Sequence, residues 1–234
     1  MSQITTITFF KFKGFPNKMW ALSRMQLAHR KLSKIEGQTF YKLMGSGKGI
    51  GFNPLPDWST YALLQVWQEE KSADHYFQSA DLYKEYQSRS EEVWSIYMKN
   101  VRAHGEWDCK NPFEKSINLA SNKTTLVLTR ATIKWRRMID FWSFVPKSHE
   151  SLLTNDGLIY TKGVGELPIV QMATISLWKD EESVKRFAYE SAAHKEAIQR
   201  TQKLKWYKEE LFARFKPYKS LGTWEGVNPL ADLL

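Results

Sequence analysis

Gly105-Glu106-Trp107-Asp108, followed by Asn111-Pro112-Phe113, has a counterpart later in the chain: Gly222-Thr223-Trp224-Glu225, followed by Asn228-Pro229-Leu230. Both copies read G-x-W-acidic-x-x-N-P-apolar, and they are offset by 117 residues. A landmark that recurs at a fixed offset is typical of a duplicated unit. We therefore predict two copies of one unit in tandem, residues 1–115 and 122–234, joined by a polar stretch.

Within each half, the apolar pattern predicts the same order of elements. Runs rich in β-branched and aromatic residues indicate strands, and apolar residues three or four apart indicate helices. For the first half we expect strands at 4–10, 40–44, 61–67 and 101–107 and helices at 20–32 and 72–98. For the second half we expect strands at 124–133, 158–162, 170–178 and 220–224 and helices at 139–153 and 181–215. This β-α-β-β-α-β order is that of the ferredoxin-like unit.

A single ferredoxin-like unit leaves one face of its sheet uncovered. Two units bury those faces by packing them together, which is how dimers of single units build an α+β barrel. The predicted fold class is thus α+β, with two tandem ferredoxin-like units forming a dimeric α+β barrel within one chain. Either the barrel interior or the gap between a sheet and its helices can hold a ligand.

Composition limits the cellular locations and binding partners that we expect for the protein. Cys109 is the only cysteine, which excludes an internal disulfide, and the N-terminus lacks the pattern of a signal peptide. We expect a cytoplasmic protein. The net charge of +9 is spread along the chain, with Trp135-Arg136-Arg137 as its densest spot. That distribution does not favour nucleic acid, and it suits contact with an anionic membrane surface at the inner face of the membrane.

Several familiar catalytic motifs are absent from the sequence. No G-x-G-x-x-G follows the first strand, and Gly45-Ser46-Gly47-Lys48-Gly49 lacks the P-loop pattern. There is also no H-E-x-x-H and no G-x-S-x-G. A Rossmann dinucleotide site, a zincin centre and an α/β-hydrolase triad are therefore not expected.

One of the five histidines stands out as a candidate haem ligand. Haem iron needs a single protein ligand from below, so what matters is the helix face on which a histidine lies. His194 shares a face with Phe187, Ser191 and Ile198, and this face should turn inward because Phe187 and Ile198 are apolar. The alternative is a hydrogen-bonded core histidine. His29 is the rival, on an apolar face of the first half.

Two cations on predicted strands are candidate partners for a ligand carboxylate. Arg130 interrupts the apolar strand of residues 126–129, and Lys162 precedes Gly163-Val164-Gly165. A strand arginine beside a barrel suits a carboxylate such as a haem propionate. The alternative for Arg130 is an edge or surface position.

Blocks spread over nearly the whole chain resemble the spheroidene monooxygenase family of carotenoid biosynthesis. The blocks are residues 42–47 with 51–52, 128–133, 163–168, 206–215 and 222–224. The resemblance implies an oxygenase that uses haem b and places oxygen, as hydroxyl or keto, at C-2 of an acyclic carotenoid such as spheroidene. It also implies a fold similar to chlorite dismutases and aldoxime dehydratases, whose axial histidine lies on a helix of the C-terminal half. His194 matches that histidine by position.

Other functions remain open from sequence. They are a haem lyase of the aldoxime dehydratase type, a non-enzymatic binder of haem or another apolar ligand, and an interaction module without cofactor. The expected partners are the carotenoid, an electron donor that the sequence does not identify, and a membrane surface. A second copy of the chain is a further candidate partner.

Overall fold

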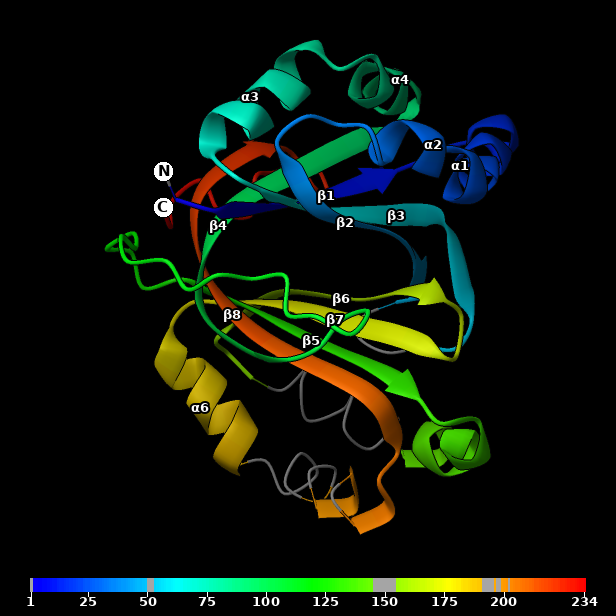
Figure 1. Cartoon of the computed structure of the whole chain (residues 1–234), viewed down its shortest axis with the longest axis vertical. Coiled ribbons are helices and arrows are strands. Elements are labelled where there is room, and N and C mark those ends of the chain that lie inside the picture. Colours follow the sequence, from blue (N-terminus) through cyan, green and yellow to red (C-terminus); the bar gives the residue numbers. More distant parts are fainter. Residues whose placement is uncertain (1, 50–52, 145–154, 191–195, 197–198, 202) are drawn as a thin grey trace.

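The strands of the computed structural model close into one antiparallel barrel (Figure 1). Residues 2–49, 53–144, 155–190, 196, 199–201 and 203–234 are described. In this part of the chain the strand order is β1-β3-β2-β6-β7-β5-β8-β4. The strands are β1 (Ile4–Lys11), β2 (Gln38–Gly47), β3 (Pro56–Trp67), β4 (Glu92–Gly105), β5 (Thr125–Ile133), β6 (Leu158–Leu167), β7 (Gln171–Trp178) and β8 (Tyr207–Gly222).

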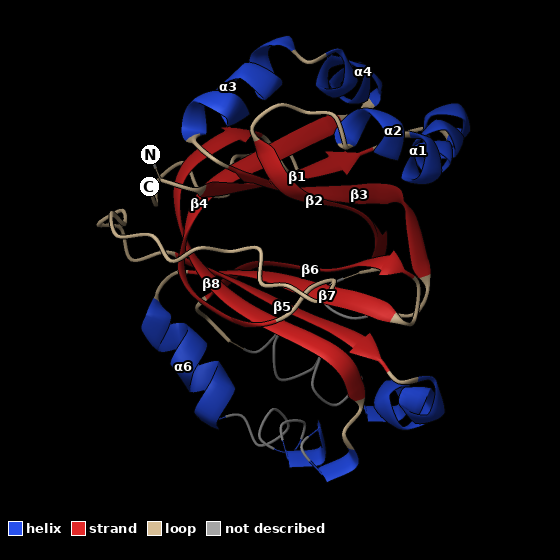
Figure 2. Ribbon diagram, viewed as in Figure 1, coloured by secondary structure: helices blue, strands red, loops and turns tan. Residues whose placement is uncertain are grey.

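Each half contributes one four-stranded sheet with the same order. The first sheet runs β4-β1-β3-β2 and the second β8-β5-β7-β6, which is the ferredoxin-like arrangement that the sequence predicts. Two seams join them. β2 and β6 pair only at Gly45 with Gly165 and Ser46 with Val164, whereas β4 and β8 pair from Trp94 through Gly105. Figure 2 shows the two sheets facing each other with helices outside both.

The helices cover the outer faces of the sheets. On the first half they are α1 (Phe15–Leu27), α2 (His29–Leu32), α3 (Glu70–Ser79) and α4 (Asp81–Arg89). On the second half they are η1 (Trp135–Arg137), the helical residues 138–144, α6 (Glu181–Glu190) and the helical residues 199–201 and 203–204. No helix in these ranges is both long and apolar enough to cross a bilayer.

The barrel interior is a packed core to which all eight strands contribute. Phe9 of β1 lies against Trp94 of β4, with ring centroids 5.7 Å apart, and Tyr160 of β6 meets both rings edge-on. The two repeated tryptophans, Trp107 and Trp224, belong to the same buried cluster. The expectation that the two sheets bury their bare faces against each other is confirmed.

Two of the predicted helices include residues that form strands in the structure. Residues 92–98 belong to β4, where Trp94, Ile96 and Met98 alternate into the core, and residues 207–215 belong to β8. Both segments are apolar enough to fit a helical period, but their alternation fits the barrel better. The β1–β4 pairing places Trp94 opposite Phe9, and the β5–β8 pairing places Leu211 opposite Arg130, so the position that corresponds to Trp94 is Leu211 and not Trp206.

Candidate functional site

Two tryptophans serve as reference positions for aligning the two halves. Trp67 ends β3 and pairs with Ile4 and Gln38, while Trp178 ends β7 and pairs with Thr125 and Leu158. Strand positions counted back from each tryptophan therefore correspond, and so do the residues paired with them. Differences in side-chain size at corresponding positions show where large side chains cover the sheet in one half and small side chains stand in the other.

The outer face of the first sheet is filled by large side chains. Phe10, Leu43 and Leu63 belong to one continuous buried cluster that also takes in residues of α1 through α4. Some polar groups on this face are paired with each other, while Gln65 Oε1 and the Tyr86 hydroxyl are buried without a hydrogen-bond partner in the described part of the chain. Trp67 Nε1 donates to Thr6 Oγ1 at 2.9 Å, and the Thr8 and Ser95 hydroxyls are 2.9 Å apart.

The outer face of the second sheet is split into two apolar clusters. One comprises Ile133, Phe141, Phe144, Met172 and Trp206, and the other comprises Val127, Trp178 and Val184. Between them lie small side chains, which we call the threonine band: Thr129, Thr161, Gly163 and Thr174. Gly163 and Thr174 correspond to Leu43 and Leu63 of the first half.

The threonine band carries hydrogen-bonding groups without partners. The Thr161 and Thr174 hydroxyls are buried, and neither has a hydrogen-bond partner in the described part of the chain. Thr129 is exposed although β7 and β8 flank it on both sides. Leaving a buried hydroxyl unpaired costs about 1–3 kcal/mol. The band therefore combines small side chains with hydroxyls that lack a described hydrogen-bond partner.

Of the predicted haem residues on the 181–215 segment, the structure describes Phe187. Its ring packs at 5.4 Å from the ring of Trp178, so the inward-facing position expected for it is correct. This places α6 over the face that carries the threonine band. Ser191, His194 and Ile198 lie outside the described residues, and their roles stay predictions.

Arg130 and Lys162 lie on the other side of the sheet, inside the barrel. Arg130 is 1% exposed and forms an ion pair with Glu209, and its guanidinium carbon is 5.4 Å from the centroid of the Trp107 ring. Lys162 Nζ is 3.0 Å from Asp57 Oδ2. The sequence suggests a ligand carboxylate for each cation. The structure gives each a carboxylate of the chain itself, and neither cation shares the face of Phe187.

Sequence reasoning missed the partners in this internal charged layer. Lys42 occupies the position in β2 that Lys162 occupies in β6, and it contacts Asp108 at 2.5 Å and also Glu166. Trp107 Nε1 donates to Glu166 Oε1 at 2.7 Å. These contacts tie the halves together. The available signal was a lysine shortly before paired glycines in both halves, but the acids are distant in sequence.

Hydrogen bonds set the charge state of two acids in this layer. Burial acts to raise the pKa of Glu209, but the backbone N–H of Cys109 and the Arg130 guanidinium outweigh it and hold that pKa below its ordinary value. Burial likewise opposes ionisation of Asp57, while hydrogen bonds from Ser59 and Lys162 lower the pKa of that carboxyl overall. Both acids therefore stay ionised as partners of the buried cations.

Two described histidines lie on the first half away from the threonine band, whereas the ring of His104 lies 5.3 Å from that of Phe212, the β8 partner of Thr129. His29 is exposed in α2, with Nδ1 3.1 Å from the Tyr41 hydroxyl. His75 is exposed in α3, and His104 is exposed near the end of β4. Within the described ranges, no three His, Cys, Asp or Glu side chains gather as they would around a metal ion.

An apolar cavity lies at the short seam between the halves. It measures about 260 Å³ and is bounded by α1, the start of β3 and the β6–β7 turn. Trp58, Ile169 and Met172 line it, and so do the paired Gly45 and Gly165.

Two ferredoxin-like sheets closed into one barrel within a single chain define a protein of the tandem dimeric α+β barrel class. Solved structures agree with this fold. Aldoxime dehydratase superposes with a TM-score of 0.67 over 99% of this chain and 88% of its own, at 9% identity. An aldoxime dehydratase bound to butyraldoxime gives 0.63 over 99% and 86%, at 10% identity. At such identities the likeness concerns the fold alone.

Sequence relatives define the family. The chain is 33% identical over 233 residues to the spheroidene monooxygenase of Cereibacter sphaeroides, covering 99% of this chain and 72% of that one. It is 32% identical to that of Rhodobacter capsulatus, covering 98% and 96%, and 25% identical to that of Rubrivivax gelatinosus, covering 89% and 80%. No family model matches the chain. The chain belongs to the spheroidene monooxygenase family and is an oxidoreductase.

Proposed function

We propose that the protein is a haem-dependent monooxygenase that introduces oxygen at C-2 of an acyclic carotenoid such as spheroidene. The names of its relatives support the reaction class and the substrate. The threonine band supports the cofactor and is the observation on which the proposal rests. It combines small side chains and unpaired hydroxyls on the outer face of the C-terminal sheet, the half that holds the axial histidine in the haem proteins that the sequence resembles.

The chain's own residues fit such a group. Phe187 and Trp178 supply an aromatic wall at one edge of the threonine band, and Met172 belongs to the apolar cluster at its other edge. The Thr161 and Thr174 hydroxyls are free to donate hydrogen bonds towards it. His194 follows Phe187 by seven residues, which is two helical turns, so the helical pattern puts both on one face. His194 would be the residue that holds the haem iron.

Bound haem would supply oxygen activation, and the chain would supply a dry site and orientation. A monooxygenase puts one oxygen atom of O₂ into the product and releases the other as water. Two electrons and two protons must therefore come from a donor outside this chain. Arg130 and Lys162 have no part in this proposal, because both are neutralised inside the barrel.

The test replaces His194 with Ala and follows the haem spectrum. We expect the Soret band of the reconstituted protein to be lost or shifted, and added imidazole to restore a histidine-like spectrum in the open cavity. Apolar contacts retain part of the affinity, so the iron's spectrum is more informative than occupancy. His29→Ala is the matched control, since His29 is exposed on the first half, and its spectrum should equal that of the wild type.

Product analysis in a host that makes acyclic carotenoids tests the reaction. The wild type should yield carotenoid that has gained oxygen, and His194→Ala should not. Two results would contradict the proposal: a protein that shows no Soret band after reconstitution, or a haem protein that leaves the carotenoid unchanged. The second result would favour the lyase or the non-enzymatic alternative.

A further inference from the structure

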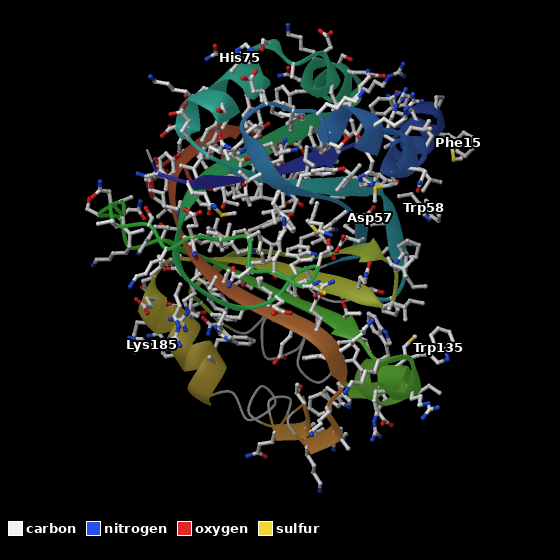
Figure 3. All side chains as sticks on the ribbon, in the orientation of Figure 1. Phe15, Asp57, Trp58, His75, Trp135 and Lys185 are labelled. Carbon is white, nitrogen blue, oxygen red and sulfur yellow. The ribbon has the colours of Figure 1, made fainter. Side chains whose placement is uncertain are left out.

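Exposed apolar side chains gather on one side of the molecule. Phe15, Trp58 and Trp135 lie along the same edge of the view, opposite Lys185 of α6 (Figure 3). Trp58 is 50% exposed and Trp135 80%. Other exposed apolar residues come from the adjoining segments: Leu55 before β3, Leu167 and Ile169 at the β6–β7 turn, and Ile139 after η1.

Hydrogen bonds hold these segments next to one another. The backbone N–H of Ile133 donates to Val170 O at 2.8 Å, which attaches the end of β5 to the β6–β7 turn. Trp142 Nε1 donates to Ile169 O at 3.1 Å, which attaches the helical residues after η1. Trp58 and Ile169 line the same cavity. The exposed apolar groups near the start of β3, at the β6–β7 turn and after η1 therefore lie on adjoining segments.

Cations border this surface. An open groove of about 730 Å³ beside Trp135 is lined by Lys134, Arg136, Arg137, Lys203, Lys205 and Lys208. Arg137 is paired with Asp140 at 3.4 Å. None of the other five makes an ion pair with any residue that the structure describes. We call the groove and the exposed apolar groups together the basic apolar face.

We propose that the basic apolar face docks on an anionic lipid bilayer. Tryptophan is enriched at membrane interfaces, where its apolar ring and its N–H meet different surroundings. Aliphatic groups beside it enter the headgroup–acyl boundary, while lysine and arginine pair with lipid phosphates. An acidic protein partner would suit the cations, but it gives no reason for so many exposed apolar groups among them.

The apolar cavity borders the same face and suggests how a substrate leaves the bilayer. Its lining residues Trp58 and Ile169 belong to the face, and Leu22, Met25 and Met172 make its wall apolar. A hydrocarbon end could pass from lipid into this cavity without crossing water. This step rests on the proposed carotenoid substrate, whereas the docking itself does not.

The test measures co-sedimentation of the full-length protein with vesicles. The wild type should bind vesicles of phosphatidylcholine mixed with phosphatidylglycerol at low salt, and binding should weaken as salt rises. Arg136→Glu with Lys205→Glu should lower the partition coefficient at least tenfold. Lys71→Glu with Lys185→Glu makes the same change in net charge on α3 and α6, and we expect little effect from it.

A second pair of variants tests the apolar contribution. Trp58→Ala with Trp135→Ala should lower the partition coefficient about tenfold and reduce quenching of tryptophan emission by lipids brominated near the headgroup. Ile117→Ala, at a side chain that is 96% exposed elsewhere, should change neither. The proposal fails if the wild type does not bind anionic vesicles, or if the two charge-reversal pairs act alike. It also fails if the tryptophan variants bind normally, a result that would favour an acidic protein. No readout involves haem or turnover, so this test is independent of the proposed reaction.

Discussion

The outer faces of the two half-sheets correspond position by position when counted from Trp67 and Trp178, yet their side chains differ in size and in packing. Leu43 and Leu63 of the first half meet helices in one continuous cluster. Their counterparts Gly163 and Thr174 are smaller and belong to neither of the two clusters on the second face. A buried leucine contributes about 1.5–3 kcal/mol. The second half therefore forgoes packing that the first half uses, and the proposed haem, if it binds only the folded state, would restore stability there.

The largest effect is expected when the threonine band is filled. Thr174→Leu gives the second half the residue that the first half has at this position and removes a buried hydroxyl without a described partner. We expect the apoprotein to stay as stable as the wild type or to gain stability. Haem binding should fall by more than tenfold, because the side chain occupies the ligand's space. Haem titration followed at the Soret band and thermal unfolding of the apoprotein measure the two effects.

The reciprocal change tests the other side of the comparison. Leu63 is 3% exposed, and Leu63→Thr removes apolar volume from a filled cluster and buries a new hydroxyl. We expect a loss of about 3–4 kcal/mol in the free energy of unfolding, with haem affinity per folded molecule unchanged. Equal losses of stability in Thr174→Leu and Leu63→Thr would show that both faces are packed alike, and the haem site would then lie elsewhere.

The sequence predicts the fold better than it predicts the site. Alternating apolar residues and the two G-x-W signatures are local features, and they lead to the strand order. The threonine band is not local. Threonine is an ordinary strand residue, and only the pairing of β5, β6 and β7 shows that Thr129, Thr161 and Thr174 lie side by side. The sequence does not predict the ion-pair partners of Arg130 and Lys162 for the same reason, since Glu209 and Asp57 are far away in sequence.

The inner faces also differ at corresponding positions, and the expected effect there is smaller. Phe9 stacks in the aromatic core, while its counterpart Arg130 depends on Glu209. Glu209→Gln should lower the free energy of unfolding at pH 7 by about 2–3 kcal/mol, because a buried guanidinium loses its nearer counter-charge and keeps only Glu166 at 4.0 Å. The value lies below that of a fully buried pair because the Glu209 side chain is 17% exposed. Glu210→Gln is the control, at an exposed neighbour, and should cost less than about 0.5 kcal/mol.

The pH dependence identifies the cause of that loss. The pKa of Glu209 is lowered in the folded protein, so its contribution is complete above the unfolded-state pKa of about 4.3 and disappears as pH falls through the lower folded-state pKa. Denaturant unfolding of the wild type and Glu209→Gln should therefore converge in acid below about pH 4. A stability difference that stays constant from pH 7 into acid would mean that the variant acts through packing instead of charge.

The smallest effect concerns two glycines that face each other across the β2–β6 seam. Gly45 and Gly165 are paired, yet a Cβ added at Gly45 would meet nothing within 4 Å, whereas at Gly165 it would lie 2.5 Å from Gln171 O. Gly45→Ala should therefore be neutral or stabilising by up to about 1 kcal/mol, since it restricts the unfolded chain. Gly165→Ala should cost about 1–3 kcal/mol, because backbone must move. Denaturant midpoints of the two variants measure the difference. Equal losses of stability in the two variants would mean that the fold also requires glycine at position 45. The cavity beside Gly45 would then be a packing defect.

A neutral Gly45→Ala instead leaves that cavity open to a ligand. Gly45→Leu, whose side chain fills the cavity, should then slow carotenoid turnover without unfolding the protein.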